Sequence, residues 1–378
     1  MSIRRLAVLS RYDPELKFGW SGIPFHILRE MRRHFPEVRG FHPSKLLLQH
    51  ARDRWVWRQR RWFKRYAPAG MNGVTLRIRG SQLGRAMTAW GADAVLAAGV
   101  DDIAAFLPRK LPLIHHSDTT FAAMRDYYPS FREFTPRVAR LSEKVARTTI
   151  QRAALCLYPS RWAADSAIGH YGAAADKVEV VPYGANLDPV PDRAQALGPR
   201  DGELCRLLMV ARDWERKGGD IAVAVVEELD RMGVPARLTV IGNCPVDHPL
   251  VEAVGLLDKD VPEQAARFQE HFARSHVLLL PTRADCSAIV FAEAAAYGMP
   301  AFTTRTGGVP ESVVDGETGQ LFALDAPPRA YAEAIAAMWQ EPGSGAAMRA
   351  GARDHFERTL NWEAWGRAAA DAIRARFP

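Results

Sequence analysis

Two carboxylates, Asp285 and Glu293, stand eight residues apart in the segment DCSAIVFAE. An apolar run, HVLLLPT (276–282), precedes the segment, and an Ala-rich stretch follows it. In a parallel sheet with crossover helices, such a loop lies beyond the carboxyl end of a strand, where ligands bind. Backbone amides from Cys286 to Val290 could then face an anion or sugar hydroxyls, and the carboxylates could accept hydrogen bonds from a polyol. In the alternative, structural interpretation, Asp285 only caps a helix and Glu293 is solvated.

Two further segments carry residues of the same chemical use. In ARDWERKGG, Arg212 and Lys217 follow the apolar run CRLLMVA (205–211), and such cations bind phosphate well, Arg as a planar fork and Lys as a point charge. In RTGGVPESVVDGETG, the adjacent glycines Gly307 and Gly308 let a backbone approach a ligand closely. Alone, basic loop residues are more often simply solvated, so the signal lies in the three segments together.

The elements that must position these loops alternate between short apolar runs and stretches of helical period, which predicts parallel sheets with crossover helices. We expect helices at 218–232, 289–297 and 361–377, and a linker at 184–203, where three prolines interrupt the pattern. The expected strands are 5–10, 92–98, 111–116, 154–159 and 177–184 before the linker, and 205–211, 236–242, 276–282, 300–306 and 319–324 after it. Two doubly wound halves follow, divided near residue 190.

Composition sets outer bounds on the class of protein. The 378 residues (42.0 kDa) are 48% hydrophobic and 25% charged, which is enough chain for two globular domains. The four cysteines show neither C-x-x-C spacing nor a histidine pattern typical of zinc, so we expect no metal site and a reducing, cytoplasmic environment. The apolar run at the N-terminus is too short for a signal peptide or a membrane span.

Charge is concentrated in the first 90 residues, which hold 19 Lys and Arg against 5 Asp and Glu. Within them, RDRWVWRQRRWFKRY (52–66) interleaves seven cations with aromatic rings. Cations and stacking rings suit single-stranded nucleic acid, but no RNA-binding module surrounds them. An amphipathic helix on an anionic membrane surface and a surface helix packed on its own domain are equally good interpretations.

The order of these segments resembles family 4 of the retaining GT-B glycosyltransferases. Such enzymes carry an R-x4-K pair, a glycine after the next strand, an E-x7-E segment followed by A-x-G-x-P, and a GG-x-x-E turn. In this sequence the corresponding residues are Arg212 and Lys217, Gly242 in VIGNCP, Asp285 and Glu293, AAYGMP and GGVPE. The N-terminal half matches through SGIP (21–24), YPSRWAADSAIGHYGAAADKVEVVPYGANLD and the final WEAW segment.

The resemblance implies an α/β fold of the GT-B type, with two Rossmann-like doubly wound domains facing a central cleft. It implies an acceptor-binding domain at 1–188 and a nucleotide-sugar-binding domain at 200–360. The last segment, 361–378, would be a helix that crosses back to the N-terminal domain.

The resemblance also implies roles for single residues. Arg212 and Lys217 would neutralise the departing diphosphate, Asp285 would contact the transferred sugar, and His116, or its neighbour His115, would lie near the reacting carbon. Glu293 would bind the ribose. The remaining donor contacts would come from Gly22, Gly242, Leu257, Cys286, Ser287, Ala288, Ile289 and Val290.

One departure from the family pattern is Asp285, which stands where the first Glu of E-x7-E is expected and is one methylene shorter. A different sugar, a repositioned loop or lost activity would each account for it, and we favour the first because the cations, Glu293 and both glycine turns are kept.

The expected function is therefore a retaining, metal-independent transfer of a hexose from a UDP- or GDP-linked sugar to a hydroxyl of a glycan or lipid-linked glycan, as in cell-surface polysaccharide assembly. No cofactor besides the donor substrate is expected. The alternatives are a non-catalytic sugar-nucleotide binding protein and a nucleic-acid-binding protein acting through 52–66, although the leading interpretation expects no nucleic acid partner. The expected location is cytoplasmic, with peripheral contact of 52–66 with the inner face of the plasma membrane as an option.

Overall fold

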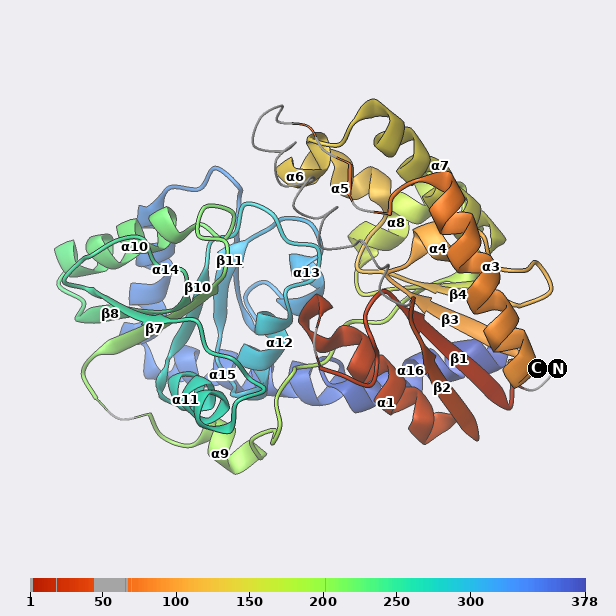
Figure 1. Ribbon diagram of the computed structural model, residues 1–378. Helices are drawn as coiled ribbons and strands as arrows, with labels where there is room; N and C mark the ends of the chain where they lie inside the picture. The colour runs from red at the N-terminus through yellow and green to blue at the C-terminus, as the bar shows by residue number, and fades with distance from the viewer. Residues whose placement is uncertain (1–2, 18, 44–64, 66, 69, 201) are drawn as a thin grey trace. The chain divides into compact units, whose positions relative to one another are not determined.

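The computed structural model describes residues 1–378 except 1–2, 18, 44–64, 66, 69 and 201 (Figure 1). The chain divides into two compact units, of which the first contains 1–181 together with 365–378 and the second contains 182–364. Each unit has a six-stranded parallel sheet with helices on both faces. The prediction of a two-domain, doubly wound α/β fold is confirmed.

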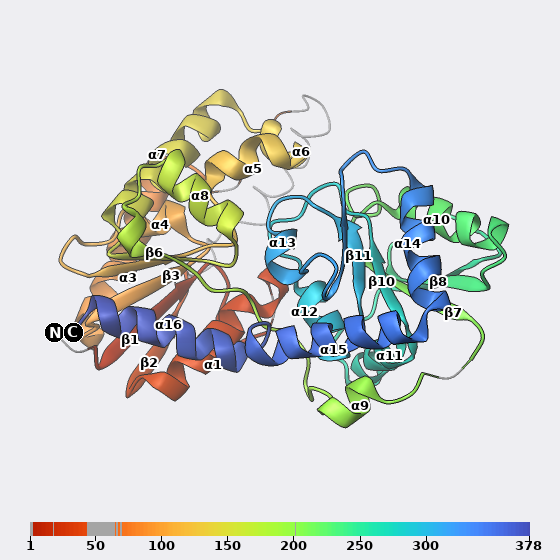
Figure 2. The same ribbon diagram turned by 180° about the vertical axis from the view of Figure 1, so that it is seen from behind.

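The sheet of the first unit has the strand order β2-β1-β3-β4-β5-β6. Helices α1 (Ile23–His34) and α16 (Trp362–Arg376) lie on one face, and α3 (Gly73–Trp90), α4 (Asp101–Ala104) and α7 (Pro136–Arg152) lie on the other (Figures 1 and 2). The strands are β1 (Arg5–Ser10), β2 (Glu37–Phe41), β3 (Ala94–Ala98), β4 (Leu113–His116), β5 (Leu155–Tyr158) and β6 (Val178–Val180), and the further helices are α5 (Phe121–Tyr127), α6 (Pro129–Arg132) and α8 (Arg161–Gly169).

The sheet of the second unit has the strand order β12-β11-β10-β7-β8-β9. Its strands are β7 (Cys205–Ala211), β8 (Ala236–Gly242), β9 (Val251–Gly255), β10 (Val277–Leu280), β11 (Ala301–Thr304) and β12 (Gly319–Phe322). Its helices are α9 (Arg193–Leu197), α10 (Gly219–Arg231), α11 (Pro262–Arg274), α12 (Ile289–Ala296), α13 (Val309–Ser312), α14 (Pro328–Gln340) and α15 (Pro342–Arg358). Because all strands run parallel, the loops after β7, β8, β10 and β11 leave the sheet at the same edge.

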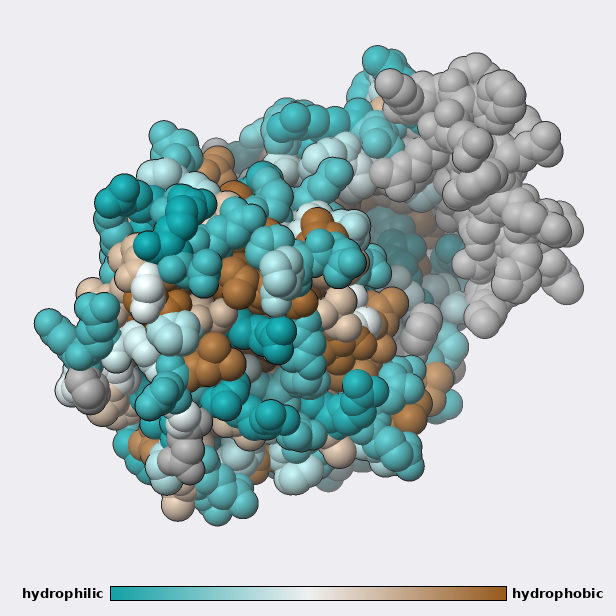
Figure 3. Space-filling view, turned by 90° about the vertical axis from the view of Figure 1, so that its left-hand side faces the viewer, coloured by the Kyte–Doolittle hydropathy of each residue, from teal (hydrophilic) through white to brown (hydrophobic). Residues whose placement is uncertain are grey.

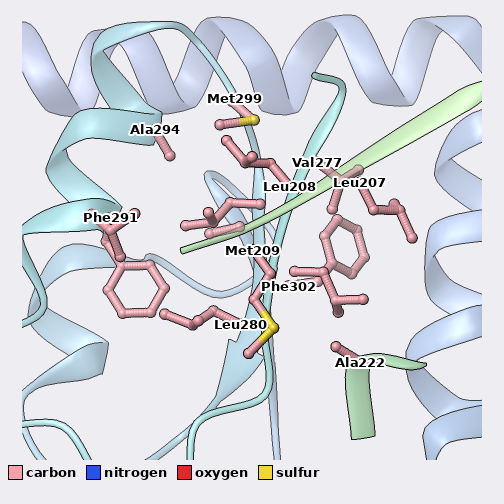
Figure 4. Close-up of a cluster of buried hydrophobic side chains, with 14 of the residues drawn as sticks. Leu207, Leu208, Met209, Ala222, Val277, Leu280, Phe291, Ala294, Met299 and Phe302 are labelled. Carbon is pink, nitrogen blue, oxygen red and sulfur yellow. The ribbon is translucent and has the colours of Figure 1, made fainter. Parts of the chain in front are cut away.

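The central strands of the second unit are apolar on both faces because helices cover both faces. Leu207, Leu208 and Met209 of β7 are fully buried, and so is Phe302 of β11. Figure 4 shows these side chains grouped with Phe291 of α12. Truncating a buried aromatic side chain of this kind to Ala costs about 3–5 kcal/mol, so this core fixes the strand ends that carry the loops.

The structure corrects the predicted organisation in three places. The units divide between Val181 and Pro182 rather than near 190, because the segment after Pro182 pairs with the second unit through the Ala185 N–H to Leu360 O bond of 3.0 Å. The expected linker contains the short helix α9, which begins with an Asp192 capping box. The strands β2 and β9 were not predicted, since both are edge strands with exposed, polar positions.

Figure 3 turns the side of the molecule with β8 and α10 toward the viewer, and on this face hydrophobic residues lie in small groups among hydrophilic ones. Scattered apolar surface of this kind needs no partner to cover it. None of the described helices combines the length and the apolar composition that a bilayer crossing requires.

Candidate active site

The loop after β7 makes one helical turn before α10 begins. The Lys217 N–H donates to Asp213 O at 3.0 Å, and Gly218 then takes a left-handed conformation at φ +75°. A Cβ at Gly218 would lie 2.0 Å from Pro281 O, so only glycine allows this loop to touch the loop after β10. The turn directs Arg216 and Lys217 toward that second loop.

The loop after β10 is bonded to this turn through its backbone. The Arg283 N–H donates to Arg216 O at 2.8 Å, and the Thr282 hydroxyl donates to the same oxygen at 3.2 Å. The loop after β11 joins them, because the Gly308 N–H donates to Asp285 O at 3.1 Å. Three loops that are far apart in sequence are therefore held as one assembly at the carboxyl edge of the sheet.

Asp285 lies at the centre of this assembly and is 6% exposed. Lys217 Nζ donates to Asp285 Oδ2, and Arg216 Nη1 reaches the same oxygen at 3.4 Å while it donates to Ala284 O at 2.8 Å. Asp285 therefore holds two cations rather than capping α12, because the N-cap of α12 is Ala288 and that cap has no side-chain hydrogen bond. The structural interpretation of Asp285 as a helix cap is wrong.

Arg216 was missed by the sequence analysis, which singled out Arg212. The Arg212 side chain is exposed, and its carbonyl accepts a hydrogen bond from Asn243 Nδ2 at 2.6 Å. The signal that could have found Arg216 is its position next to Lys217, inside a turn that ends at a glycine.

Glu293 lies in α12, 2% exposed, and accepts a hydrogen bond from Lys259 Nζ. Lys259 comes from the segment after β9, and its ammonium also lies 4.4 Å from the centre of the Phe268 ring. The sequence analysis missed Lys259 as well, although it singled out Leu257 two residues earlier, which is half-buried against the core of the second unit. The prediction that Glu293 is simply solvated is wrong.

The residues between the two carboxylates form the start of α12. Cys286 and Val290 are buried, whereas Ser287, Ala288 and Ile289 are half-buried. No acidic residue stands in the first turn of α12, so the partial positive charge of its N-terminus is not offset there by the helix's own side chains. This helix end and the cations beside Asp285 give the edge a positive potential suited to an anion.

Gly242 ends β8 in the same edge, with φ +128°. A Cβ at this position would lie 2.0 Å from Ala211 O of the neighbouring strand, so the close pairing of β7 and β8 requires glycine.

In the first unit, His115 and His116 end β4 and point to opposite faces of the sheet. His116 is buried between two indole rings, with ring-centre distances of 5.9 Å to Trp20 and 5.7 Å to Trp365. Burial, with His115 nearby, lowers the pKa of His116 to about 3, so its imidazole is neutral at physiological pH. Gly22 lies in the same unit as the left-handed N-cap residue of α1.

His115 faces the other way and bonds to Asp101 Oδ1 at 2.7 Å. Burial by itself lowers the pKa of His115, but the ion pair with Asp101 outweighs it and raises the pKa to about 10. His115 is therefore a buried structural cation, which leaves His116 as the candidate for contact with a ligand.

No group of three His, Cys, Asp or Glu side chains could hold a metal ion within the part of the chain that the structure describes. The basic aromatic stretch 52–66 lies outside the described residues except Arg65, so the predicted membrane or nucleic-acid contact there is not tested by this geometry.

Comparison with known proteins agrees with this geometry. A family model described as "Glycosyl transferases group 1" matches residues 205–341, which span the second sheet and its loops. A "D-inositol 3-phosphate glycosyltransferase" from Xylanimonas cellulosilytica is 31% identical over 54% of this chain and 52% of its own length. A "GDP-mannose-dependent alpha-(1-6)-phosphatidylinositol monomannoside mannosyltransferase" from Mycolicibacterium smegmatis is 28% identical over 61% of this chain and 66% of its own length. The chain thus spans about half to two thirds of these relatives.

Among solved structures, sucrose-phosphate synthase from Thermosynechococcus elongatus superposes with a TM-score of 0.72 over 99% of both chains, at 17% identity. At that identity the likeness establishes the fold alone. The lipopolysaccharide glycosyltransferase WaaG superposes with a TM-score of 0.62 at 17% identity. Taken with the family match over the second unit, these likenesses establish that the chain belongs to the glycosyl transferases of group 1 and has the GT-B fold.

Proposed function

We propose that this protein transfers a hexose from a UDP- or GDP-linked sugar to a hydroxyl of a glycan or lipid-linked glycan, with retention of anomeric configuration. The observation that carries the proposal is the assembly of three loops that brings Lys217, Arg216 and Asp285 beside the N-terminus of α12. The names of the curated relatives, which include a GDP-mannose-dependent mannosyltransferase, support a nucleotide sugar as the donor.

The proposed chemistry follows from charge. As the bond between sugar and diphosphate breaks, negative charge develops on the leaving phosphate, and cations and helix amides placed beforehand stabilise it. Lys217 has three N–H donors, so it can hold a phosphate oxygen while it stays bonded to Asp285. Arg212, exposed on the same loop, supplies a second cation in this proposal.

The remaining roles are divided by position. Asp285 contacts the transferred sugar, Glu293 accepts hydrogen bonds from the ribose, and Gly22, Gly242 and Leu257 let the backbone approach the nucleotide or border the base. Cys286, Ser287, Ala288, Ile289 and Val290 present their amides to sugar and phosphate. His116, neutral because its pKa is about 3, acts as a hydrogen-bonding group rather than as a cation.

The proposal includes activity without a divalent metal or any cofactor besides the donor, since Lys217, Arg212 and the helix end supply the positive charge. A requirement for magnesium or manganese that a chelator reveals would contradict this part.

The test is turnover of UDP- and GDP-sugars, measured as release of nucleoside diphosphate in the presence of glycan acceptors. Lys217→Ala should lower turnover by about 100-fold or more, which corresponds to roughly 2.7 kcal/mol of transition-state stabilisation. Lys144→Ala, which removes an exposed lysine of α7 in the other unit, is the matched control.

Wild-type turnover in the Lys217 variant would contradict the assignment of the diphosphate site. Tight binding of nucleotide sugar with no turnover for any acceptor would favour the alternative of a non-catalytic sugar-nucleotide binding protein.

A further inference from the structure

The first unit contains a pocket of about 520 Å³. The volume is in the range of pockets that hold small ligands, about 300–1,000 Å³. All of the described residues that line it belong to the first unit, so its shape does not depend on the second. We call it the unit 1 pocket.

One side of the unit 1 pocket is polar because it is built from the ends of strands. Ser10 ends β1, and Ser117 and Thr119 follow β4. Asp102, at the start of α4, adds a carboxylate that accepts a hydrogen bond from Arg11 Nη2 at 2.7 Å.

Two hydroxyl groups in the lining lack a partner. The oxygens Thr119 Oγ1 and Ser142 Oγ are buried and have no hydrogen-bond partner among the described residues. Thr119 is 1% exposed and Ser142 is 4% exposed. A buried polar group without a partner costs about 1–3 kcal/mol, and a ligand hydroxyl in the pocket would remove that cost.

The opposite side of the unit 1 pocket is apolar. Phe121 of α5 and Phe131 of α6 lie with ring centres 6.3 Å apart, and Phe134 lies 5.2 Å from Phe131. Met124 and Val145 extend this wall. A bound molecule therefore meets hydrogen-bonding groups on one side and aromatic and aliphatic surface on the other.

The charge of the lining argues against an anion. Arg11 is the one cation among the described lining residues, and it is already paired with Asp102. Asp101 and Asp118 also line the pocket, so carboxylates outnumber cations there. His115 offsets Asp101 through their contact of 2.7 Å, but a phosphate group would still meet net negative charge.

We propose that the unit 1 pocket binds the acceptor, and that the bound part is an uncharged glycoside with an apolar substituent. This inference rests on the proposed function for the word acceptor, whereas the ligand class rests on the pocket alone. Sugar hydroxyls bond to Thr119, Ser142 and the strand-end groups, and the substituent lies against the phenylalanine wall.

The test is isothermal titration calorimetry on the full chain with three probes: octyl β-D-glucopyranoside below its micelle concentration, glucose and myo-inositol 1-phosphate. The octyl glucoside should bind, and glucose should bind about 100-fold more weakly, the effect of losing three or four buried methylene groups. The inositol phosphate should show no binding at the concentrations that saturate with the octyl glucoside.

Thr119→Val and Ser142→Ala should each weaken octyl glucoside binding by about 3- to 10-fold, the value of one hydrogen bond. Neither variant should lower the thermal midpoint, since each removes a buried hydroxyl that has no partner in the protein. Thr88→Val is the matched control, because the Thr88 hydroxyl is also buried without a partner but lies in α3 and is not among the pocket lining residues. It should leave the affinity unchanged.

Equal or tighter binding of the inositol phosphate, or unchanged octyl glucoside affinity in both hydroxyl variants, would overturn the inference. Failure of the proposed function is separable by titrating UDP and GDP in the same samples. If neither nucleotide binds while glycoside binding still responds to Thr119→Val, the ligand class stands and the transferase proposal falls.

Discussion

The contact between Arg216 and Asp285 provides the sharpest test of the site. Their closest atoms, Nη1 and Oδ2, lie 3.4 Å apart, and the side chains are 24% and 8% exposed. At an effective dielectric constant of about 20, two unit charges at this distance attract by about 5 kcal/mol. Loss of hydration offsets most of this attraction, so a net coupling of about 1–2 kcal/mol remains.

From this coupling we expect Arg216→Ala to lower kcat/KM for the nucleotide sugar by about 10-fold, because Asp285 loses one of its two cations and its position relaxes. Lys217 still holds Asp285, which limits the loss. In an Asp285→Ala background, Arg216→Ala should cost little more, since the partner is already absent. The assay is the release of nucleoside diphosphate by the two single variants and the double variant.

A matched control is the pair Arg376 and Asp176, which has the same chemistry and a similar distance of 3.2 Å but lies exposed in the first unit. Its three variants should show no coupling in kcat/KM. Additive effects of Arg216→Ala and Asp285→Ala, or a loss below about twofold in the Arg216 variant, would refute the view that two cations position Asp285 for catalysis. Circular dichroism melting curves would establish that each variant is folded.

Three other predictions concern the ribose contact, the histidines and the membrane. Glu293→Ala should weaken nucleoside diphosphate and nucleotide sugar equally, whereas Asp285→Ala should mainly weaken the nucleotide sugar; calorimetry that finds the same ratio for both variants contradicts this division. The free energy of unfolding by urea should fall as the pH drops from about 6.5 toward 3, because the pKa of His116 is lowered to about 3, and should fall as the pH rises from about 6.5 to 10, because the pKa of His115 is raised to about 10. His116→Phe should flatten the acid side of this profile and His115→Phe the alkaline side, and unchanged slopes count against these protonation states. Replacing the basic residues of 58–65 with Gln should release the protein from anionic vesicles at low salt and leave donor affinity intact, because each cation near such a surface contributes about 1 kcal/mol; co-sedimentation that never depended on these residues assigns them a structural role.

The sequence by itself predicted the two parallel sheets because their strands are buried on both faces. Runs such as CRLLMVA and HVLLLPT are almost wholly apolar, and they appear as β7 and β10 in a central part of the second sheet. The sequence also located the loops with Lys217, Asp285 and Gly308, because each follows such a run and ligand loops follow strands. The edge strands β2 and β9 escaped prediction, since their exposed polar positions weaken the pattern.

Which side chains meet in those loops was decided by tertiary structure alone. Arg212 and Arg216 are both basic residues of one loop, and only the helical turn that ends at Gly218 determines that Arg216 reaches Asp285, 69 residues later in the chain. Likewise, Lys259 contacts Glu293 only because the segment after β9 comes to lie beside α12. Spacing along the chain carries no information on such contacts, since they depend on how the separate loops pack against one another.

The two histidines of β4 illustrate the same division. The sequence placed both at a strand end, but a strand sends adjacent side chains to opposite faces, and only the helices packed on each face decide their chemistry. Asp101 of α4 makes His115 a cation, whereas the indole rings of Trp20 and Trp365 bury His116 in its neutral form. Composition and periodicity determine that a residue is at a strand end, and the packing of distant elements determines its charge.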